Sequence, residues 1–156
     1  MSENVEFEFR LTGTGWAEGR IAVGETAATP TASYLSDALG DLVRAVRALL
    51  EGAAEARASW DEEPGEYRWI LQRNGEDVRV VLLDFPDLWS DAPDHEGTVL
   101  FDATCSVAAL GVAIASGADA VLEDLGVDGY RERWVEHPFP ADDLTALHRL
   151  LQRDRH

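Results

Sequence analysis

Hydrophobic and polar residues alternate at the start of the chain. Every second residue from 5 to 11 is apolar, a period of two that is typical of a strand with one buried face. Gly13-Thr14-Gly15 is a turn signal, and residues 16–23 are expected to form the returning strand. This pair of glycines lacks the third glycine of a dinucleotide-binding loop and lies between two strands, so we interpret it as a hairpin.

A helical period follows the hairpin. Apolar residues between Leu35 and Leu50 share one helical face, and charged residues occupy the opposite face. Pro30 suits the first turn of a helix and Gly52 suits its carboxyl end, so we expect a helix over residues 30–51. Gly40 inside this helix costs about 1 kcal/mol relative to alanine, which a close contact between the helix and a sheet would explain.

Three or four further strands are expected, at residues 54–61, 67–73 and 78–83, with residues 98–102 as the fourth candidate. The first three are joined by short turns, among them an Asn-Gly pair at residues 74–75. Because a parallel crossover needs a dozen or more residues, such connections indicate antiparallel pairing.

The last third of the chain has helical spacing. One apolar stripe runs from Val107 to Leu125 and ends at Gly126, and a final helix is expected from about residue 140. Residues 106–118 carry no charge, so this half of the helix is expected either to be covered by the protein or to form a homodimer interface. The order ββα-ββββ-αα predicts a single α+β domain over residues 1–156. We expect an antiparallel sheet of about five or six strands in one layer, with helices on one face.

The net charge of the chain limits which partners it can bind. The chain has 30 acidic and 13 basic residues, a formal net charge of −17. Nucleic acids bind proteins largely through Lys and Arg, and anionic membrane surfaces repel an acidic protein, so neither is an expected partner. A basic protein or a cation has the favourable sign, although such a charge can also serve solubility alone.

Every basic residue is arginine, and the chain contains no lysine. This excludes a Walker P-loop and any reaction through a lysine Schiff base. Cys105 is the only cysteine, which permits no internal disulfide and fits a reducing compartment. The acidic amino terminus has no signal-peptide pattern, and the longest apolar run, residues 107–115, is too short for a membrane span. We therefore expect a soluble, cytoplasmic protein.

Acidic residues are concentrated in two segments. Between residues 84 and 102, the candidate ligands for Mg²⁺ or Ca²⁺ are Asp84, Asp87, Asp91, Asp94, His95, Glu96 and Asp102. Their spacing does not match an EF-hand, and solvated loop carboxylates are the alternative interpretation. Trp89 lies in the same segment, either as an exposed anchor for a partner or as a residue that covers the sheet.

The second segment contains Asp61, Glu62, Glu63 and Glu66, flanked by aromatic residues. Such a turn could receive an arginine or lysine of a partner, and paired carboxylates also suit glycoside hydrolysis. A solvated turn is the simpler interpretation.

Cys105 could act as a nucleophile with His95 or His137 as its base, but a lone cysteine beside apolar segments is typically a buried residue. The four histidines lack the spacing of metal ligands.

Four short motifs carry a resemblance. They are residues 34–37 (Tyr-Leu-Ser-Asp), residues 63–69, Gly129-Tyr130 with Trp134, and residues 137–140 (His-Pro-Phe-Pro). In these motifs the chain resembles a group of small uncharacterised acidic proteins of high-GC bacteria, a resemblance that implies no catalytic residues. In charge and size alone it is also similar to the immunity proteins of bacterial toxin systems.

These observations lead to two hypotheses of function. The first is a non-enzymatic binding protein, without a cofactor or metal, whose acidic face engages a basic protein partner. Its predicted contact residues are Asp61, Glu62, Glu63, Glu66, Asp87, Trp89, Asp91 and Asp94. The alternative is an enzyme for a small molecule, or a metal-dependent one, that uses carboxylates of residues 84–102.

Overall fold

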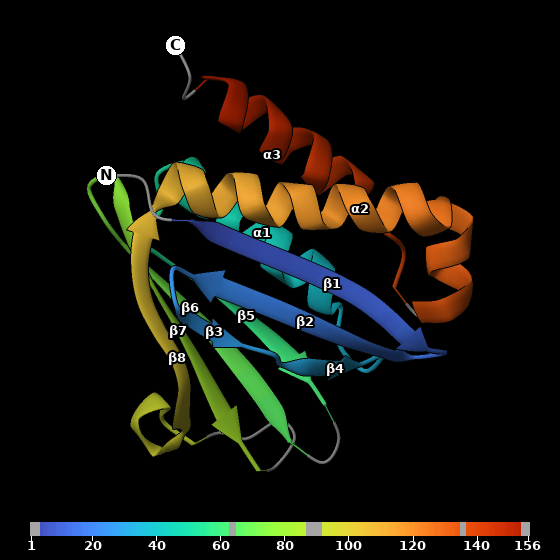
Figure 1. Cartoon of the computed structure of the whole chain (residues 1–156), viewed down its shortest axis with the longest axis horizontal. Helices are drawn as coiled ribbons and strands as arrows, with labels where there is room; N and C mark the ends of the chain where they lie inside the picture. Colours follow the sequence, from blue (N-terminus) through green and yellow to red (C-terminus); the bar gives the residue numbers. More distant parts are fainter. Residues whose placement is uncertain (1–3, 63–64, 87–91, 135–136, 154–156) are drawn as a thin grey trace.

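Figure 1 shows the computed structural model of the chain, which describes residues 4–62, 65–86, 92–134 and 137–153. In chain order its strands and helices are β1 (Val5–Gly13), β2 (Trp16–Val23), β3 (Thr26–Ala28), β4 (Thr31–Ser33), α1 (Ala38–Leu50), β5 (Glu55–Asp61), β6 (Glu66–Asn74), β7 (Asp77–Phe85), the short 3-10 helix η1 (Asp94–Glu96), β8 (Thr98–Ser106), α2 (Val107–Trp134) and α3 (Ala141–Arg153). The predicted α+β class is confirmed.

The strands form two antiparallel sheets. In the first sheet β2 pairs with β1 on one side and with β3 and β4 on the other, and the second sheet has the order β5-β6-β7-β8. Antiparallel pairing is confirmed, but a single sheet of five or six strands is wrong. The hairpin β1-β2 packs over β5, and a β-carbon at Gly19 would lie 2.6 Å from the ring of Trp60. The two sheets therefore meet face to face at this point.

Helix α1 begins later than its sequence pattern indicates. The predicted start near Pro30 is wrong, because the carbonyl of Pro30 accepts a hydrogen bond from Gly19 at 2.8 Å and residues 31–33 pair with β2. Asp37 is the residue before the helix, and its carboxylate occupies the space beside Gly40 that a side chain would need. This contact, and not a contact with a sheet, explains the glycine.

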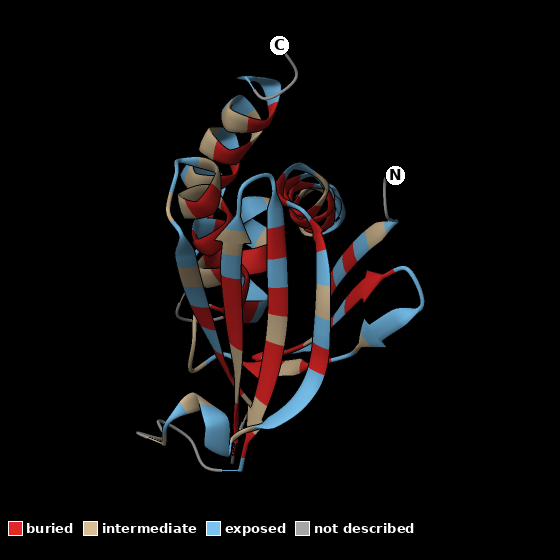
Figure 2. Ribbon diagram, turned by 90° about the vertical axis from the view of Figure 1, so that its left-hand side faces the viewer, coloured by how far each residue is buried: buried red, intermediate tan, exposed pale blue. Residues whose placement is uncertain are grey.

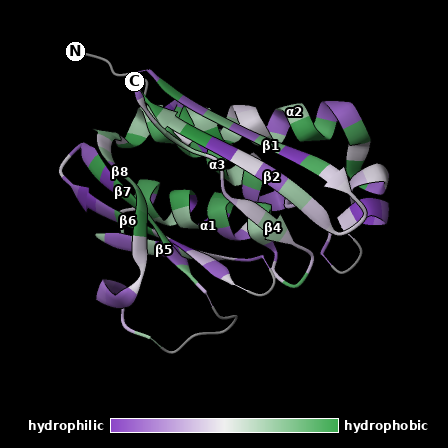
Figure 3. Cartoon of the chain, turned by 60° about the horizontal axis from the view of Figure 1, so that its bottom comes forward, coloured by the Kyte–Doolittle hydropathy of each residue, from purple (hydrophilic) through white to green (hydrophobic). Residues whose placement is uncertain are grey.

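Three helices cover the sheets. Helix α1 packs against β5, α2 and α3, and Figure 3 shows it between these elements. Helix α2 lies along β1. The helix is broken at Gly126, whose φ of 69° is outside the helical range. This break is at the residue where the sequence predicted the helix to end. None of the described helices combines the length and the apolar character needed to cross a membrane.

Large aromatic side chains join the two sheets and the helices. The ring of Trp60 lies 5.6 Å from that of Phe9 and 5.2 Å from that of Trp69, and Phe9 also contacts Trp134. Trp60 donates a hydrogen bond to the carbonyl of Ala38 at 2.9 Å, which fixes β5 to the first turn of α1. Buried and exposed positions alternate along the strands (Figure 2), so one face of β5–β8 is turned away from this core. The candidate site lies at that face and at the edge of β5.

Candidate functional site: a groove between α1 and β5

The two predicted acidic segments meet at Arg68. From β6, Glu66 lies 3.2 Å from its guanidinium, and from η1 Asp94 lies 3.1 Å away. Arg68 also donates a hydrogen bond to the carbonyl of Ala92 at 2.8 Å and lies 3.9 Å from the centre of the Phe85 ring. Its side chain is only 14% exposed, so this arginine fixes η1 to the outer face of the sheet.

Arg57 binds the other side of Asp94. Two hydrogen bonds, of 3.1 and 2.5 Å, join its guanidinium to both carboxylate oxygens of Asp94, and Glu55 lies 3.5 Å from it. The hydrogen bonds from Arg57 lower the pKa of Asp94 from its usual value, with Arg68 acting in the same direction. We call this set, Glu55, Arg57, Glu66, Arg68 and Asp94, the Asp94 network.

Two of the four carboxylates predicted between residues 61 and 66 are buried. Asp61 and Glu66 are opposite one another in the β5-β6 register and are only 4% and 5% exposed, so a solvent-exposed cluster of four carboxylates is wrong for these two. Glu62 is half-buried. The predicted contact residues Glu63, Asp87, Trp89 and Asp91 lie outside the described residues.

A second ion-pair network lies on the exposed side of α1. Arg44 lies 2.7 Å from Asp37 and 2.8 Å from Asp41, and the carboxylate of Asp143 on α3 lies within 3.3 Å of both Arg44 and Arg47. Burial raises the pKa of Asp41, against the hydrogen bond from Arg44 that lowers it. We call this set the Arg44 network; its members are Asp37, Asp41, Arg44, Arg47, Glu51 and Asp143.

A groove of about 450 Å³ lies between the two networks. Asp41, Arg44, Ala45 and Ala48 of α1 form one wall, and residues 55–59 of β5 form the other. A pocket of about 240 Å³ shares residues 57–59 with it and extends the concave surface to Glu66 and Arg68. The charged residues that line this concave surface are three carboxylates and three arginines. Counted over the two whole networks beside it, seven carboxylates stand against four arginines, so the surplus of negative charge lies around the groove.

The groove presents charged side chains beside small apolar ones. The arginines lower the pKa of Asp94 from its usual value. Among the described residues that line the groove there is no cysteine or histidine, although a serine, Ser59, lies at its rim. The arginines that organise the site were not among the predicted contact residues. A signal for them existed, because Arg57 and Arg68 alternate with apolar residues along strands and must lie on the face away from the core.

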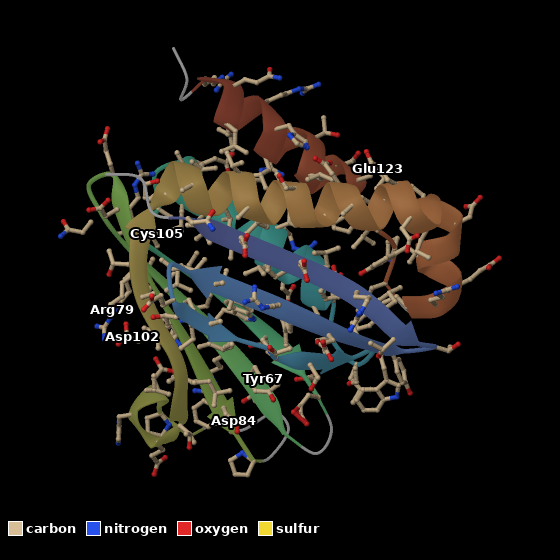
Figure 4. The ribbon with its side chains drawn as sticks, viewed as in Figure 1. Tyr67, Arg79, Asp84, Asp102, Cys105 and Glu123 are labelled. Carbon is tan, nitrogen blue, oxygen red and sulfur yellow. The ribbon has the colours of Figure 1, made fainter. Side chains whose placement is uncertain are left out.

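Asp84 and Asp102, two of the carboxylates of the enzymatic alternative, are not brought together. Asp102 faces outward on β8 and binds Arg79 through two hydrogen bonds of 2.9 and 2.7 Å, whereas Asp84 lies on the inner face beside Tyr67 (Figure 4). Burial and the carboxylate of Glu62 raise the pKa of Tyr67 to about 12. Because Asp84 and Asp102 are on opposite faces of one sheet, a single ion cannot contact both. In the part of the chain that the structure describes, no three His, Cys, Asp or Glu residues are grouped to hold a metal ion.

Cys105 and the histidines have structural positions. Cys105 is 3% exposed and packs into the core near the end of β8. His95 belongs to η1, before the start of the same strand, so about eight residues of extended chain, roughly 25 Å, separate it from Cys105. His148 pairs with Asp119 at 3.0 Å on the surface between α3 and α2.

The uncharged half of α2 is mostly covered. Its contacts with β1, α1 and α3 bury most of residues 107–118 and leave Ala108, Val112 and Ser116 exposed. A pocket of about 240 Å³ separates Val112 and Ser116 from Leu151 on α3. A homodimer at this surface stays a prediction.

Three of the motifs that carry the resemblance lie close together: residues 34–37, Tyr130 with Trp134, and residues 137–140. Trp134 donates a hydrogen bond to the carbonyl of Ser36 at 3.1 Å, and the ring of Tyr130 lies 5.4 Å from that of Phe139. Comparison with protein-family models, with curated proteins and with solved structures finds no match for this chain.

Proposed function

We propose that this chain is a non-enzymatic binding protein that engages a basic protein partner at the groove between α1 and β5 and the carboxylates around it. The observation that carries the proposal is the surplus of carboxylates in the two networks that border the groove, seven against four arginines. A net charge of −17 over the whole chain adds a long-range attraction for a basic partner.

The expected form of this recognition is fast, salt-sensitive association. Complementary charge accelerates the encounter of two proteins, and the acceleration falls as salt screens the charges. The paired arginines keep the carboxylates in fixed positions, so the partner meets an ordered pattern of negative charge rather than mobile side chains.

Binding of a fluorescent oligo-arginine peptide, measured by anisotropy at about 20 mM and about 150 mM salt, tests the proposal. The test variant is Asp41→Asn/Glu51→Gln/Glu55→Gln, which neutralises three partly exposed carboxylates of the two networks. The matched control is Glu123→Gln/Asp124→Asn/Asp128→Asn, which removes the same charge from the distant end of α2. Figure 4 shows Glu123 at that end of the molecule.

The groove variant is expected to weaken low-salt binding at least tenfold, and the control less than threefold. Equal losses in the two variants would show that total charge, and not the groove, attracts the peptide. In that case the groove is not the binding site and the proposal is wrong.

A further inference from the structure

Strand β5 is at the edge of its sheet. Along its backbone, residues that form hydrogen bonds with β6 alternate with residues whose N–H and C=O groups point away from β6. Just before β5, the carbonyl of Ala54 accepts a hydrogen bond from Arg73, and just after it Glu62 donates one to Gly65. Because hydrogen bonding alternates along an antiparallel pair, Ala56, Ala58 and Trp60 bond to β6, and the odd-numbered residues turn their N–H and C=O groups outward.

Asp61 confirms this alternation. Its N–H donates to the hydroxyl of Ser36 at 3.0 Å, and its carbonyl accepts from the hydroxyl of Ser33 at 3.1 Å. Both serines come from the segment before α1, on the side of β5 that faces away from β6. The outward groups at Asp61 are therefore satisfied by side chains.

Among the residues that the structure describes, the outward groups of Glu55, Arg57 and Ser59 have no such partners. Within the described residues, no backbone or side-chain group bonds to these three N–H and three C=O groups. They open into the groove of about 450 Å³. Over residues 55–61 the β5-β6 register contains no shift, and the strand contains no proline. This part of the edge is therefore regular enough to accept another strand.

The walls of the groove leave room for that strand. Its inner side is lined by four alanines, Ala45 and Ala48 from α1 and Ala56 and Ala58 from β5. Its outer side carries Glu55 and Arg57 and, through Arg57, Asp94. A strand added at the edge alternates its side chains between these two sides, so apolar residues would face the alanines and basic residues the carboxylates.

Charge selects the occupant. Two copies of this chain would bring together two molecules of net charge −17, whereas a basic segment meets the carboxylate surplus of both networks. We propose that an extended segment of a basic partner protein, with alternating apolar and basic residues, adds as a fifth strand to the edge of β5 in the groove beside α1. This inference rests on the proposed function and specifies how the groove recognises its partner.

The test uses a synthetic ten-residue peptide of alternating valine and arginine, and a matched peptide of alternating valine and glutamate. Amide hydrogen exchange of the whole chain, read residue by residue by NMR, is measured with and without each peptide. The valine-arginine peptide is expected to slow exchange at Glu55, Arg57 and Ser59 at least tenfold, while Ala56 and Ala58 are already protected in the free protein. The valine-glutamate peptide is expected to change none of these rates.

A pair of variants tests the backbone contact directly. Ser59→Pro removes one outward N–H and no hydrogen bond to β6, a position at which an edge strand tolerates proline, and Ser59→Ala keeps that N–H. Peptide affinity is expected to fall at least tenfold in Ser59→Pro and to change less than twofold in Ser59→Ala. The exchange measurement on the unaltered chain does not depend on either variant folding.

Three outcomes would overturn the inference. If the peptide binds but the three amides stay unprotected, strand addition is wrong while charge recognition by the groove stands. If the peptide does not bind at low salt, both the inference and the proposed function fail. If these amides are protected without peptide, in proportion to protein concentration, the occupant is a second copy of this chain.

Discussion

Asp94 accepts hydrogen bonds from Arg57 through both of its carboxylate oxygens, although 37 positions separate the two residues along the chain. Through the same carboxylate, Arg68 joins η1 to the sheet. An ion pair between fully exposed side chains contributes little to the stability of a protein. Arg68, however, is mostly buried, and it would lose its ion pair with Asp94 if that residue were neutral.

Asp94→Asn is therefore expected to lower the free energy of unfolding by about 1 kcal/mol in urea titration at pH 7. The control is Asp102→Asn, which breaks an equally short pair with Arg79 in which both side chains are well exposed, and its cost should be below about 0.5 kcal/mol. Equal losses in the two variants would contradict the structural role of Asp94.

The same pair predicts a pH dependence. The pKa of Asp94 is lowered in the folded protein, mainly by the hydrogen bonds from Arg57, so folding is favoured when this carboxyl is ionised. Its contribution is complete above the usual value of 3.8 and is lost as the pH falls through the lowered native value. The stability difference between the native chain and Asp94→Asn should therefore shrink as urea titrations are carried from pH 6 towards pH 3. A difference that stays constant over this range would exclude the ion pair as its cause.

Strand pairing was predictable from sequence, but the separation into two sheets was not. Short turns such as Asn74-Gly75 fix which strands are neighbours, because these hairpins leave no other way to connect them. The packing of the β1-β2 hairpin over β5 depends on Gly19 and Trp60, which are 41 positions apart by their numbers and share no local pattern. Hydrophobic alternation reports that one face of a strand is buried, and it does not report what buries it.

The candidate site shows the same limit. Alternation places Glu55, Arg57, Glu66 and Arg68 on the outer face of the sheet, so four of the five members of the Asp94 network were accessible to sequence reasoning. Asp94 itself lies in a connection without any hydrophobic period, and no rule of spacing places such a residue over a strand. The carboxylates were therefore recognised as a group, while the arginines that hold them were not.

Tyr130→Phe is expected to leave the protein at least as stable as the native chain. The hydroxyl of Tyr130 is buried and has no hydrogen-bond partner among the described residues, and burial raises its pKa, with the charge of Asp37 adding to the shift. Removing an unsatisfied buried hydroxyl costs nothing in lost hydrogen bonds, so the change in unfolding free energy should lie between about 0 and 1 kcal/mol in favour of the variant.

Trp134→Phe is the comparison, because the indole of Trp134 donates to the carbonyl of Ser36. It should lower stability by about 2 kcal/mol through the lost hydrogen bond and volume. The stability of both variants is measured by thermal denaturation, followed by circular dichroism. A clear loss of stability in Tyr130→Phe would show that the hydroxyl has a hydrogen-bond partner after all.

Gly117→Ala is expected to destabilise the protein although alanine favours a helix. A β-carbon at this position would lie 2.5 Å from the ring of Phe7 and 2.8 Å from its backbone carbonyl, so α2 would have to move away from β1. The cost of such overpacking, about 1–3 kcal/mol, exceeds the gain of about 1 kcal/mol in helix propensity. Gly129→Ala is the control, since its nearest neighbour would be Leu125 at 3.4 Å, and this variant should be stabilised. Urea titration of the two variants should show changes of opposite sign, and two changes of the same sign would contradict the close contact of α2 with β1.

Ser33→Ala and Ser36→Ala test whether the outward backbone groups of Asp61, at one end of β5, are satisfied by side chains while those of Ser59 are not. Ser33 is fully buried and satisfies the carbonyl of Asp61, so its loss leaves a buried acceptor without a partner and should cost about 1–3 kcal/mol. Ser36→Ala removes the acceptor of the Asp61 N–H, and exchange of this amide should become at least tenfold faster, approaching that of Ser59. Ser59→Ala, at an exposed position, should change stability by less than about 0.5 kcal/mol. If the Asp61 amide exchanges at the same rate in Ser36→Ala as in the native chain, the odd-numbered residues of β5 do not face outward, and strand addition in the groove loses its structural basis.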